Sequence, residues 1–381
     1  MTTINGSLSE PKAVLSGTHR ACSPSETLAR VRPLMAGLGI TRIADVTQLD
    51  DIGIPVYQAV RPRSRNLSVS QGKGVTKELA MVSAVMEALE TRVAEDVPVT
   101  IPNACALDLP SPLGYPLASL TRPRFQSVVE SARLDWIKAT NIRTGKRTLV
   151  PTAVVALDWT RSLRWQPRMF DSNSNGLASG NSWTEAALHG CYELIERDAV
   201  FSGSRGHQID VDSVVTPETS HMVELIRRAG NHLALRYYPH RTGLPAFSAR
   251  ITNELLPYDF AGFGCHLDAD VALNRAISEA AQSRLTEIAG SRDDLRARDY
   301  FRRRPVSAQS FADDSELLSM QDLSSNLASP DLSTDFDTVL DRISQNYEFD
   351  PVAVDLTLEP GVHVVKVIIP EARWNGGDLT W

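Results

Sequence analysis

The stretch Ser172–Asp198, SNSNGLASGNSWTEAALHGCYELIERD, runs from a loop rich in glycine and asparagine into a predicted helix with two glutamates, Glu193 and Glu196. Ser182 is a favourable N-cap residue, and Glu185 three positions later completes a capping box, so we expect the helix to begin there. Residues three apart share one face of a helix, so both carboxylates are expected to point the same way.

This pattern occurs three times in the chain. A cap-like residue stands eleven positions before a glutamate in Thr76–Glu87, Ser182–Glu193 and Asp268–Glu279. The position three residues after each glutamate is Glu90, Glu196 and Gln282 in turn. The sequence therefore predicts three related helices facing one ligand site, in an α+β fold of mixed β-sheets.

The neighbours of these glutamates on the helix face are small. Ala80, Ala186 and Ala272 each lie seven residues before one of them, where a solvated face usually carries Lys, Glu or Gln. We interpret the small residues as space left for a ligand. The alternative is that glutamates three apart merely decorate exposed helices, which is the better reading of any single pair. Three pairs in one register favour a shared site.

The composition is that of a soluble globular protein, with 42% hydrophobic residues among 381. A net charge of −7 argues against a nucleic-acid or anionic-membrane partner. No apolar run approaches the ~18 residues of a membrane span, and Met1–Gly17 lacks the apolar core of a signal peptide. Four cysteines without a CxxC pair suit a reducing cytoplasm. Cys191, inside the second predicted helix, is expected to be a buried thiol.

We divide the chain into an N-terminal region, residues 1–60, and a main domain, residues 61–381. The first 17 residues are expected to be a loose tail, followed by a helix beginning at Ser23 and short strands. A peripheral insertion, helical or loop, is predicted at about 292–347, where Arg302–Arg304 forms a solvated basic run. Further strands are predicted at 66–70, 136–142, 148–157, 233–238, 246–251, 352–358 and 362–369.

The residues before the first helix, Gly72-Lys73-Gly74, resemble a phosphate-binding turn, but the P-loop spacing GxxxxGK[ST] is absent. Glycines before all three helices supply backbone N–H groups and helix N-termini that suit anions. Converging carboxylates would repel a triphosphate unless Mg²⁺ lay between them. The carboxylates that fit this role are Glu87, Glu90, Glu193 and Glu196, with Glu185 and Glu279 as further candidates. The side chains that could meet phosphate oxygens directly are Lys73, Arg197 and Arg284.

Three stretches carry a family resemblance. SQGKGVTKELAMVSAVMEALETR (70–92), SNGLASGNSWTEAALHGCYELIERDA (174–199) and GCHLDADVALNRAISEAAQSRL (264–285) resemble the signature blocks of the YcaO family. The segment beginning GTHR at Gly17 and ending GITRIADVT at Thr47 resembles the YcaO proteins that act with a TfuA-type partner. The resemblance implies a YcaO-type fold, with residues 61–381 as the ATP-binding catalytic domain, and ATP- and Mg²⁺-dependent activation of a peptide backbone amide.

The resemblance also implies which residues bind the two cofactors, ATP and Mg²⁺. Those that would bind ATP are Lys73, Ser83, Asn181, Glu185, Arg197, Gln282 and Arg284. Those that would bind Mg²⁺ are Glu87, Glu90, Glu193 and Glu196. Ala178 departs from the family, which often has serine there, and the tail Ala372–Trp381 lacks the Pro-rich C-terminus of ring-forming members. Either that tail is not needed for this chemistry, or catalysis differs here.

The resemblance favours thioamide formation in a ribosomally made peptide or protein, with a TfuA-like partner and a sulfide donor. The alternatives are an azoline-forming cyclodehydratase and a nucleotide-binding partner subunit without turnover of its own. A homodimer is possible. No catalytic residue can be assigned: His189 could touch the site or pack structurally, and His19 with Arg20 could cover a substrate cleft.

Overall fold

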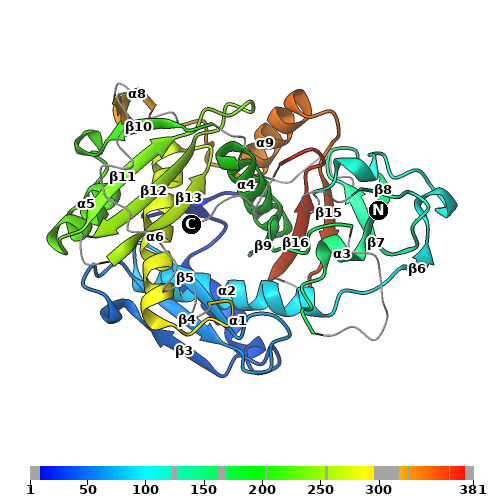
Figure 1. Cartoon of the computed structure of the whole chain (residues 1–381), viewed down its shortest axis with the longest axis horizontal. Coiled ribbons are helices and arrows are strands. Elements are labelled where there is room, and N and C mark those ends of the chain that lie inside the picture. Colours follow the sequence, from blue (N-terminus) through cyan, green and yellow to red (C-terminus); the bar gives the residue numbers. More distant parts are fainter. Residues whose placement is uncertain are drawn as a thin grey trace. The chain divides into compact units, whose positions relative to one another are not determined.

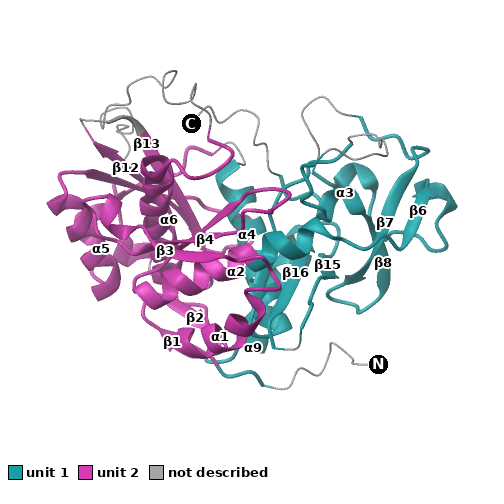
Figure 2. Ribbon diagram, turned by 90° about the horizontal axis from the view of Figure 1, so that it is seen from below, with its two compact units in different colours: residues 1–11, 89–202, 329–380 teal, residues 12–88, 203–328, 381 magenta. Residues whose placement is uncertain are grey.

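The computed structural model describes residues 9–121, 127–160, 169–201, 204–253, 256–295, 317–323, 326–359 and 361–373. The chain forms two compact units that are interleaved in sequence (Figure 2). Unit 1 contains residues 1–11, 89–202 and 329–380, and unit 2 contains residues 12–88, 203–328 and 381. The helix α2, Lys77–Glu95, begins in unit 2 and ends in unit 1. The predicted domain boundary at residue 60 stays a prediction.

Unit 2 is built around the buried helix α6, Ala269–Ala289, which packs against two sheets (Figure 1). The five-stranded sheet has the order β13-β12-β11-β10-β14, and the three-stranded sheet the order β3-β4-β5. The strands are β3 (Arg42–Asp45), β4 (Val56–Val60), β5 (Val69–Lys73), β10 (His207–Asp210), β11 (His232–Tyr237), β12 (Ala246–Asn253), β13 (Leu256–Cys265) and β14 (Leu318–Ser319). Smaller elements of the unit are α1 (Pro24–Val31), α5 (Pro217–Arg228) and α8 (Met320–Leu323).

Unit 1 is a six-stranded sheet of order β6-β7-β15-β16-β9, in which β8 also pairs with β7. Its strands are β6 (Ile101–Ala104), β7 (Leu134–Asn141), β8 (Arg147–Pro151), β9 (Leu177–Gly180), β15 (Val352–Asp355) and β16 (His363–Ile368). Its helices besides the end of α2 are α3 (Thr152–Val155), α4 (Trp183–Phe201) and α9 (Leu332–Asn346). Helix α4 packs on β9 and β16, and α9 packs on α4.

The helix starts follow the predicted capping chemistry. Ser182 Oγ accepts a hydrogen bond from Glu185 N (3.0 Å), and Thr76 Oγ1 accepts one from Leu79 N (3.2 Å). Asp268 caps α6 by accepting from Asp270 N at 2.9 Å. Because these caps join residues two or three apart, the sequence specifies them locally.

Several predicted segments were wrong. Residues 13–15, assigned to a loose tail, form β1 (Ala13–Leu15), which pairs with β2 (Thr18–Arg20). Residues 152–155, predicted as strand, form α3. The predicted insertion, expected to be helical or loop, includes α9, a helix with buried Phe336 that packs on α4, and its bounds stay a prediction. The basic run 302–304 and the C-terminal residues 374–381 lie outside the described residues.

Gly72 and Lys73 do not form the predicted turn, because they belong to a strand. The predicted phosphate contact of Lys73 stays a prediction. Gly72 and Lys73 are the last two residues of strand β5, and Gly74 follows the strand. Lys73 is paired with Val56 of β4. A Cβ on Gly72 would stand 2.0 Å from Ala84 N and 2.2 Å from Ala80 O. Glycine is therefore required because β5 lies directly on the backbone of α2.

The small residues of the three helices have the same explanation. A Cβ on Gly264 would stand 2.0 Å from Ala272 O, and one on Gly180 would stand 2.6 Å from Ala186 N. The space beside these alanines is filled by the strand that precedes each helix, and not by a ligand. Each repeated element is thus a strand and a helix in close backbone contact, β5–α2, β9–α4 and β13–α6.

Candidate functional site

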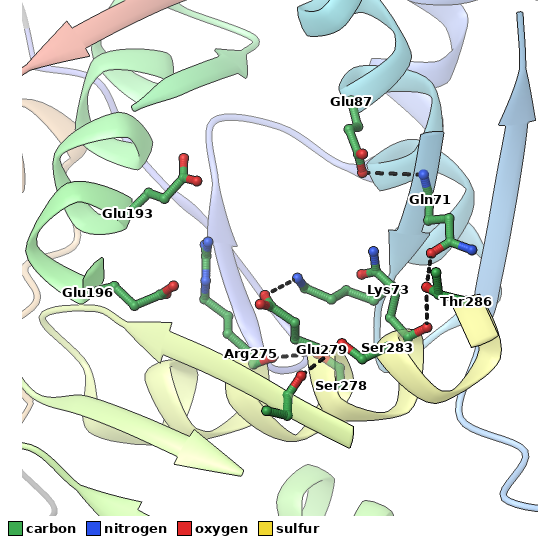
Figure 3. Close-up of polar contacts among 12 residues, drawn as sticks. Gln71, Lys73, Glu87, Glu193, Glu196, Arg275, Ser278, Glu279, Ser283 and Thr286 are labelled. Atoms are coloured by element: carbon green, nitrogen blue, oxygen red, sulfur yellow. Dashed lines mark hydrogen bonds and ion pairs between the residues drawn. The ribbon is translucent and has the colours of Figure 1, made fainter. Parts of the chain in front are cut away.

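Unit 2 holds Glu87 in a restrained position on α2. Its Oε2 accepts a hydrogen bond from the backbone N–H of Gln71 on β5, at 3.3 Å (Figure 3). Burial raises the pKa of Glu87 to about 7, although the positive charges of Arg292 and Lys73 oppose this shift. A carboxylate that is removed from water in this way is stabilised in its charged form by a bound cation.

Lys73 and Glu279 form an ion pair between β5 and α6 (Figure 3). Both side chains are 22% exposed, so the pair is open to solvent on one side. The predicted phosphate contact of Lys73 and the possible metal contact of Glu279 thus concern two groups that neutralise each other. An incoming phosphate would compete with Glu279 for the same ammonium group.

In unit 2, buried donor atoms of Gln71 and Arg284 have no hydrogen-bond partner among the described residues. Gln71 is 1% exposed, and its Oε1 accepts from Thr286 Oγ1, but its Nε2 donates to no described group. Arg284 is 7% exposed; its Nε donates to Asp50 Oδ2 at 2.8 Å, while its Nη1 has no acceptor. Buried donors are normally paired. These two fit a ligand that brings oxygen acceptors, as a nucleotide does.

Charged groups of both signs surround the start of α6, where Asp268 caps the helix and burial, together with the charge of Asp268, raises the pKa of Asp270. The rings of His19 and His266 lie 5.1 Å apart, edge to face. Burial, and then the charges of His19, Arg275, Lys12 and Arg20, hold the pKa of His266 well below its ordinary value. The predicted role of His19 and Arg20 over a substrate cleft stays a prediction.

Unit 1 holds the second pair of glutamates on α4. Glu193 and Glu196 project from the same side of the helix, as their spacing predicts (Figure 3). Glu193 Oε2 accepts from the backbone N–H of Gly176 at 3.1 Å, just as Glu87 accepts from Gln71. Arg197 approaches both carboxylates, with Nη1 3.5 Å from Glu196 Oε1 and Nη2 3.9 Å from Glu193 Oε1.

The remaining predicted residues of unit 1 pair with backbone groups or with each other. Glu90 Oε1, at the unit 1 end of α2, accepts from both the N–H and the hydroxyl of Ser179, at 2.8 and 2.5 Å. Asn181 donates from its backbone and its side chain to Glu185 Oε2, at 2.9 and 3.1 Å. Each acidic side chain is therefore oriented by the strand or turn that precedes a helix.

The structure places the predicted site residues in two sets. Lys73, Ser83, Glu87, Gln282 and Arg284 belong to unit 2. Glu90, Asn181, Glu185, Glu193, Glu196 and Arg197 belong to unit 1. Within the described residues, no three His, Cys, Asp or Glu side chains form a ready-made metal cluster. Mg²⁺ is commonly held by one or two carboxylates together with phosphates and water, so the donor set suits a metal that arrives with a nucleotide.

Sequence reasoning missed Lys366, a buried charge in unit 1. It lies on β16, is 2% exposed, and donates from Nζ to Asn173 O at 2.6 Å. Burial lowers the pKa of Lys366 to about 8, against the attraction of Glu193. The signal in the sequence is a single lysine inside the apolar run Val362–Ile369. The predicted buried thiol, Cys191, is confirmed and is fully buried.

The fold is shared with proteins of known structure. One is a heterocyclase in complex with substrate and cofactor, with a TM-score of 0.80 and 22% identity, over 96% of this chain and 54% of that protein. Another is YcaO from Methanopyrus kandleri bound with AMPPCP and Mg²⁺, with a TM-score of 0.76 and 23% identity, over 95% and 94%. The chain therefore has the same fold as these proteins, which confirms the predicted α+β, YcaO-type architecture.

Curated relatives are more similar in sequence. An uncharacterized protein of Mycobacterium tuberculosis is 44% identical over 289 residues, 75% of this chain, which spans 66% of that relative's length. An uncharacterized protein in the tfuA 3′ region of Rhizobium leguminosarum bv. trifolii is 39% identical over 320 residues, covering 79% and 75%. A family model described as YcaO cyclodehydratase, ATP- and Mg²⁺-binding, matches residues 71–373.

The chain belongs to the YcaO family. The resemblance found in the three sequence blocks is confirmed, and ATP and Mg²⁺ are the cofactors of this family. No helix of the described residues has both the length and the apolar character needed to cross a membrane. The individual binding residues stay predictions, for which the geometry above gives the local setting.

Proposed function

We propose that this protein uses ATP to activate a peptide backbone amide and installs a thioamide, with sulfide as the nucleophile. The observation that carries the proposal is the setting of Glu87. Burial raises its pKa to about 7, and it accepts a hydrogen bond from Gln71, whose own side-chain nitrogen is an unpaired buried donor. Such a group favours a cation that arrives with an oxygen-rich ligand.

Hydrosulfide adds to the amide carbon, and the former carbonyl oxygen attacks the γ-phosphorus of ATP, so that ADP leaves. The carbon–oxygen bond then breaks and phosphate departs with the oxygen. Sulfur forms C=S and gives its proton to water or to the departing phosphate. One ATP becomes ADP and phosphate for each oxygen replaced. An amide oxygen is a poor leaving group, and phosphorylation makes it a good one.

The protein's own side chains position the reactants and compensate charge. Bound Mg²⁺ would neutralise phosphate charge, held by Glu87, Glu90, Glu193 and Glu196. In unit 2, Lys73 and Arg284 would donate to phosphate oxygens. In unit 1, Arg197 would contribute a further positive charge. The predicted ATP contacts of Ser83, Asn181, Glu185 and Gln282 are part of the same proposal.

Thioamide formation is favoured over ring formation by the relationship to the protein of the tfuA 3′ region, which is 39% identical over 320 residues. We therefore include a TfuA-like partner, a peptide or protein substrate, a sulfide donor and a cytoplasmic location in the proposal. Azoline formation is the second candidate. It is supported by the description of the family as cyclodehydratases and by the likeness to a heterocyclase. There, the side chain of a neighbouring Cys, Ser or Thr would take the place of sulfide.

The test is incubation with a candidate precursor peptide, ATP, Mg²⁺ and sulfide, with and without a TfuA-like protein, followed by mass spectrometry. We expect a gain of about 16 Da per residue, from sulfur replacing oxygen, and phosphate release that depends on peptide. A loss of about 18 Da would establish the azoline alternative. Binding of Mg²⁺ and nucleotide without phosphate release under any of these conditions would indicate a non-catalytic partner subunit.

A further inference from the structure

Lys366 is a charged group that the proposed chemistry does not use, and its position is costly. Its neighbours along β16, Val365 and Val367, are fully buried, and Lys366 itself is 2% exposed. An ammonium group is stable inside a protein only where it meets acceptors or an opposite charge. Lys366 has both, since its Nζ donates to Asn173 O at 2.6 Å and it is attracted by Glu193.

The acceptor belongs to the turn that leads to β9, and β16 holds this turn at both ends. At one end is the contact between Lys366 and Asn173. At the other end, Val367 N donates to Gly176 O at 2.8 Å. The backbone N–H of Gly176 then donates to Glu193 Oε2 at 3.1 Å. One short segment thus connects β16 to the carboxylate on α4.

Packing leaves this segment little freedom to adjust. Gly176 has a φ of +76°, and a Cβ there would stand 2.4 Å from Val367 O and 2.9 Å from Leu194 Cδ1. A Cβ on Gly190 would stand 2.9 Å from Gly176 O. The turn is therefore held between β16 and α4, so that a movement of its first residue changes the direction of the Gly176 N–H.

We propose that Lys366 is a positioning residue for Glu193, holding the Asn173–Gly176 turn so that the Gly176 N–H fixes the carboxylate in its metal-binding orientation. The inference rests on the proposed role of Glu193 as a ligand of Mg²⁺. All contacts in it lie within unit 1. Outer groups that orient metal ligands typically change metal affinity by about 10- to 100-fold when removed.

A small cavity of about 40 Å³ adjoins Lys366 and is lined in part by Asn173, Asn175 and Arg197. This space can accept the larger head group of arginine at position 366. Lys366→Arg is therefore the conservative variant that keeps the charge and a donor to Asn173 O. Lys366→Met removes both, and Lys366→Gln keeps a donor but removes the charge.

The experiment measures binding of a non-hydrolysable ATP analogue to the full chain as Mg²⁺ is titrated, together with the unfolding temperature of the ligand-free protein. We expect Lys366→Met to raise the half-saturating Mg²⁺ concentration by about 10-fold or more. Lys366→Arg should stay within about threefold of wild type, and Lys366→Gln should lie between them. Analogue affinity at saturating Mg²⁺ should change little.

The matched control is Tyr115→Phe, which removes a buried hydrogen bond to Leu149 O (2.8 Å) on the β8 side of the same unit. It should lower the unfolding temperature and leave the Mg²⁺ titration unchanged. If Lys366→Met lowers the unfolding temperature like the control but does not shift the Mg²⁺ titration, Lys366 is only structural and the inference is wrong. If Lys366→Met does not fold, an unshifted titration for Lys366→Gln has the same meaning. If the wild-type protein binds the analogue equally well with and without Mg²⁺, the proposed function is refuted, and the inference with it.

Discussion

Replacing Gly72 by alanine tests whether this glycine serves packing or phosphate binding. The new Cβ would stand 2.0 Å from Ala84 N, where real Cβ contacts are almost never under 3.0 Å, so β5 and α2 must separate by about 1 Å. The atoms on the other side are helix backbone, which cannot move aside by changing a rotamer. Overpacking in a tight core costs about 1–3 kcal/mol, and we expect the upper end of that range.

The matched control is Gly37→Ala, whose nearest atom would be Leu34 O at an ordinary 3.5 Å. That change should be neutral or stabilise by up to about 1 kcal/mol, because alanine reduces the entropy of the unfolded chain. Urea unfolding followed by circular dichroism should therefore separate the two variants by about 3 kcal/mol. Equal stability of the two variants would refute the packing argument. Equal stability with a loss of nucleotide affinity for Gly72→Ala alone would restore the phosphate-turn interpretation.

Three further predictions concern the glutamates and the core of unit 1. Glu87→Gln should abolish Mg²⁺-dependent nucleotide binding. The ligand-free variant should be as stable as wild type at pH 8, or more stable, because the substitution removes a buried charge. A loss of stability above about 1 kcal/mol in urea unfolding would contradict this. The raised pKa of Glu87, about 7, means that protons compete with the metal below that pH. The half-saturating Mg²⁺ concentration should thus fall as the pH rises from 6 to 8. The stability of the ligand-free protein should decrease as the pH rises from about 4.5 to 7. A half-saturating Mg²⁺ concentration that does not change with pH would show that Glu87 is no ligand. Tyr347→Phe removes the buried hydrogen bond to Asp198 (2.6 Å) and should cost about 1.5–3 kcal/mol in urea unfolding, because the acceptor is a carboxylate. The Mg²⁺ titration should not change, and a shifted titration would place this pair at the site.

The helices and their capping residues could be predicted because they depend on groups close in sequence. Ser23, Ser182 and Asp268 begin helices where their side chains accept backbone N–H groups a few residues later. The three-residue spacing of Glu193 and Glu196 likewise fixes their common direction. Three matching helices were therefore visible in the sequence, and so was the family.

The meaning of the small residues could not be predicted. Whether Ala80 or Ala272 faces a ligand or a strand depends on which strand packs against the helix, and that is decided by contacts distant in sequence. Gly72 and Gly264 are understood only when the helix backbone is seen 2.0 Å from the position of a hypothetical Cβ.

By itself, the sequence determined where the acidic helices begin, which way their paired carboxylates point, and which family the chain belongs to. Only the tertiary structure decided which donors hold those carboxylates, as Gln71 holds Glu87 and Gly176 holds Glu193. It also decided that Lys366, isolated in an apolar strand, reaches the turn beside Glu193. The physical reason is range: caps and helix faces arise within one or two turns of chain, whereas burial and hydrogen bonding of a charge require segments that meet only in the folded protein.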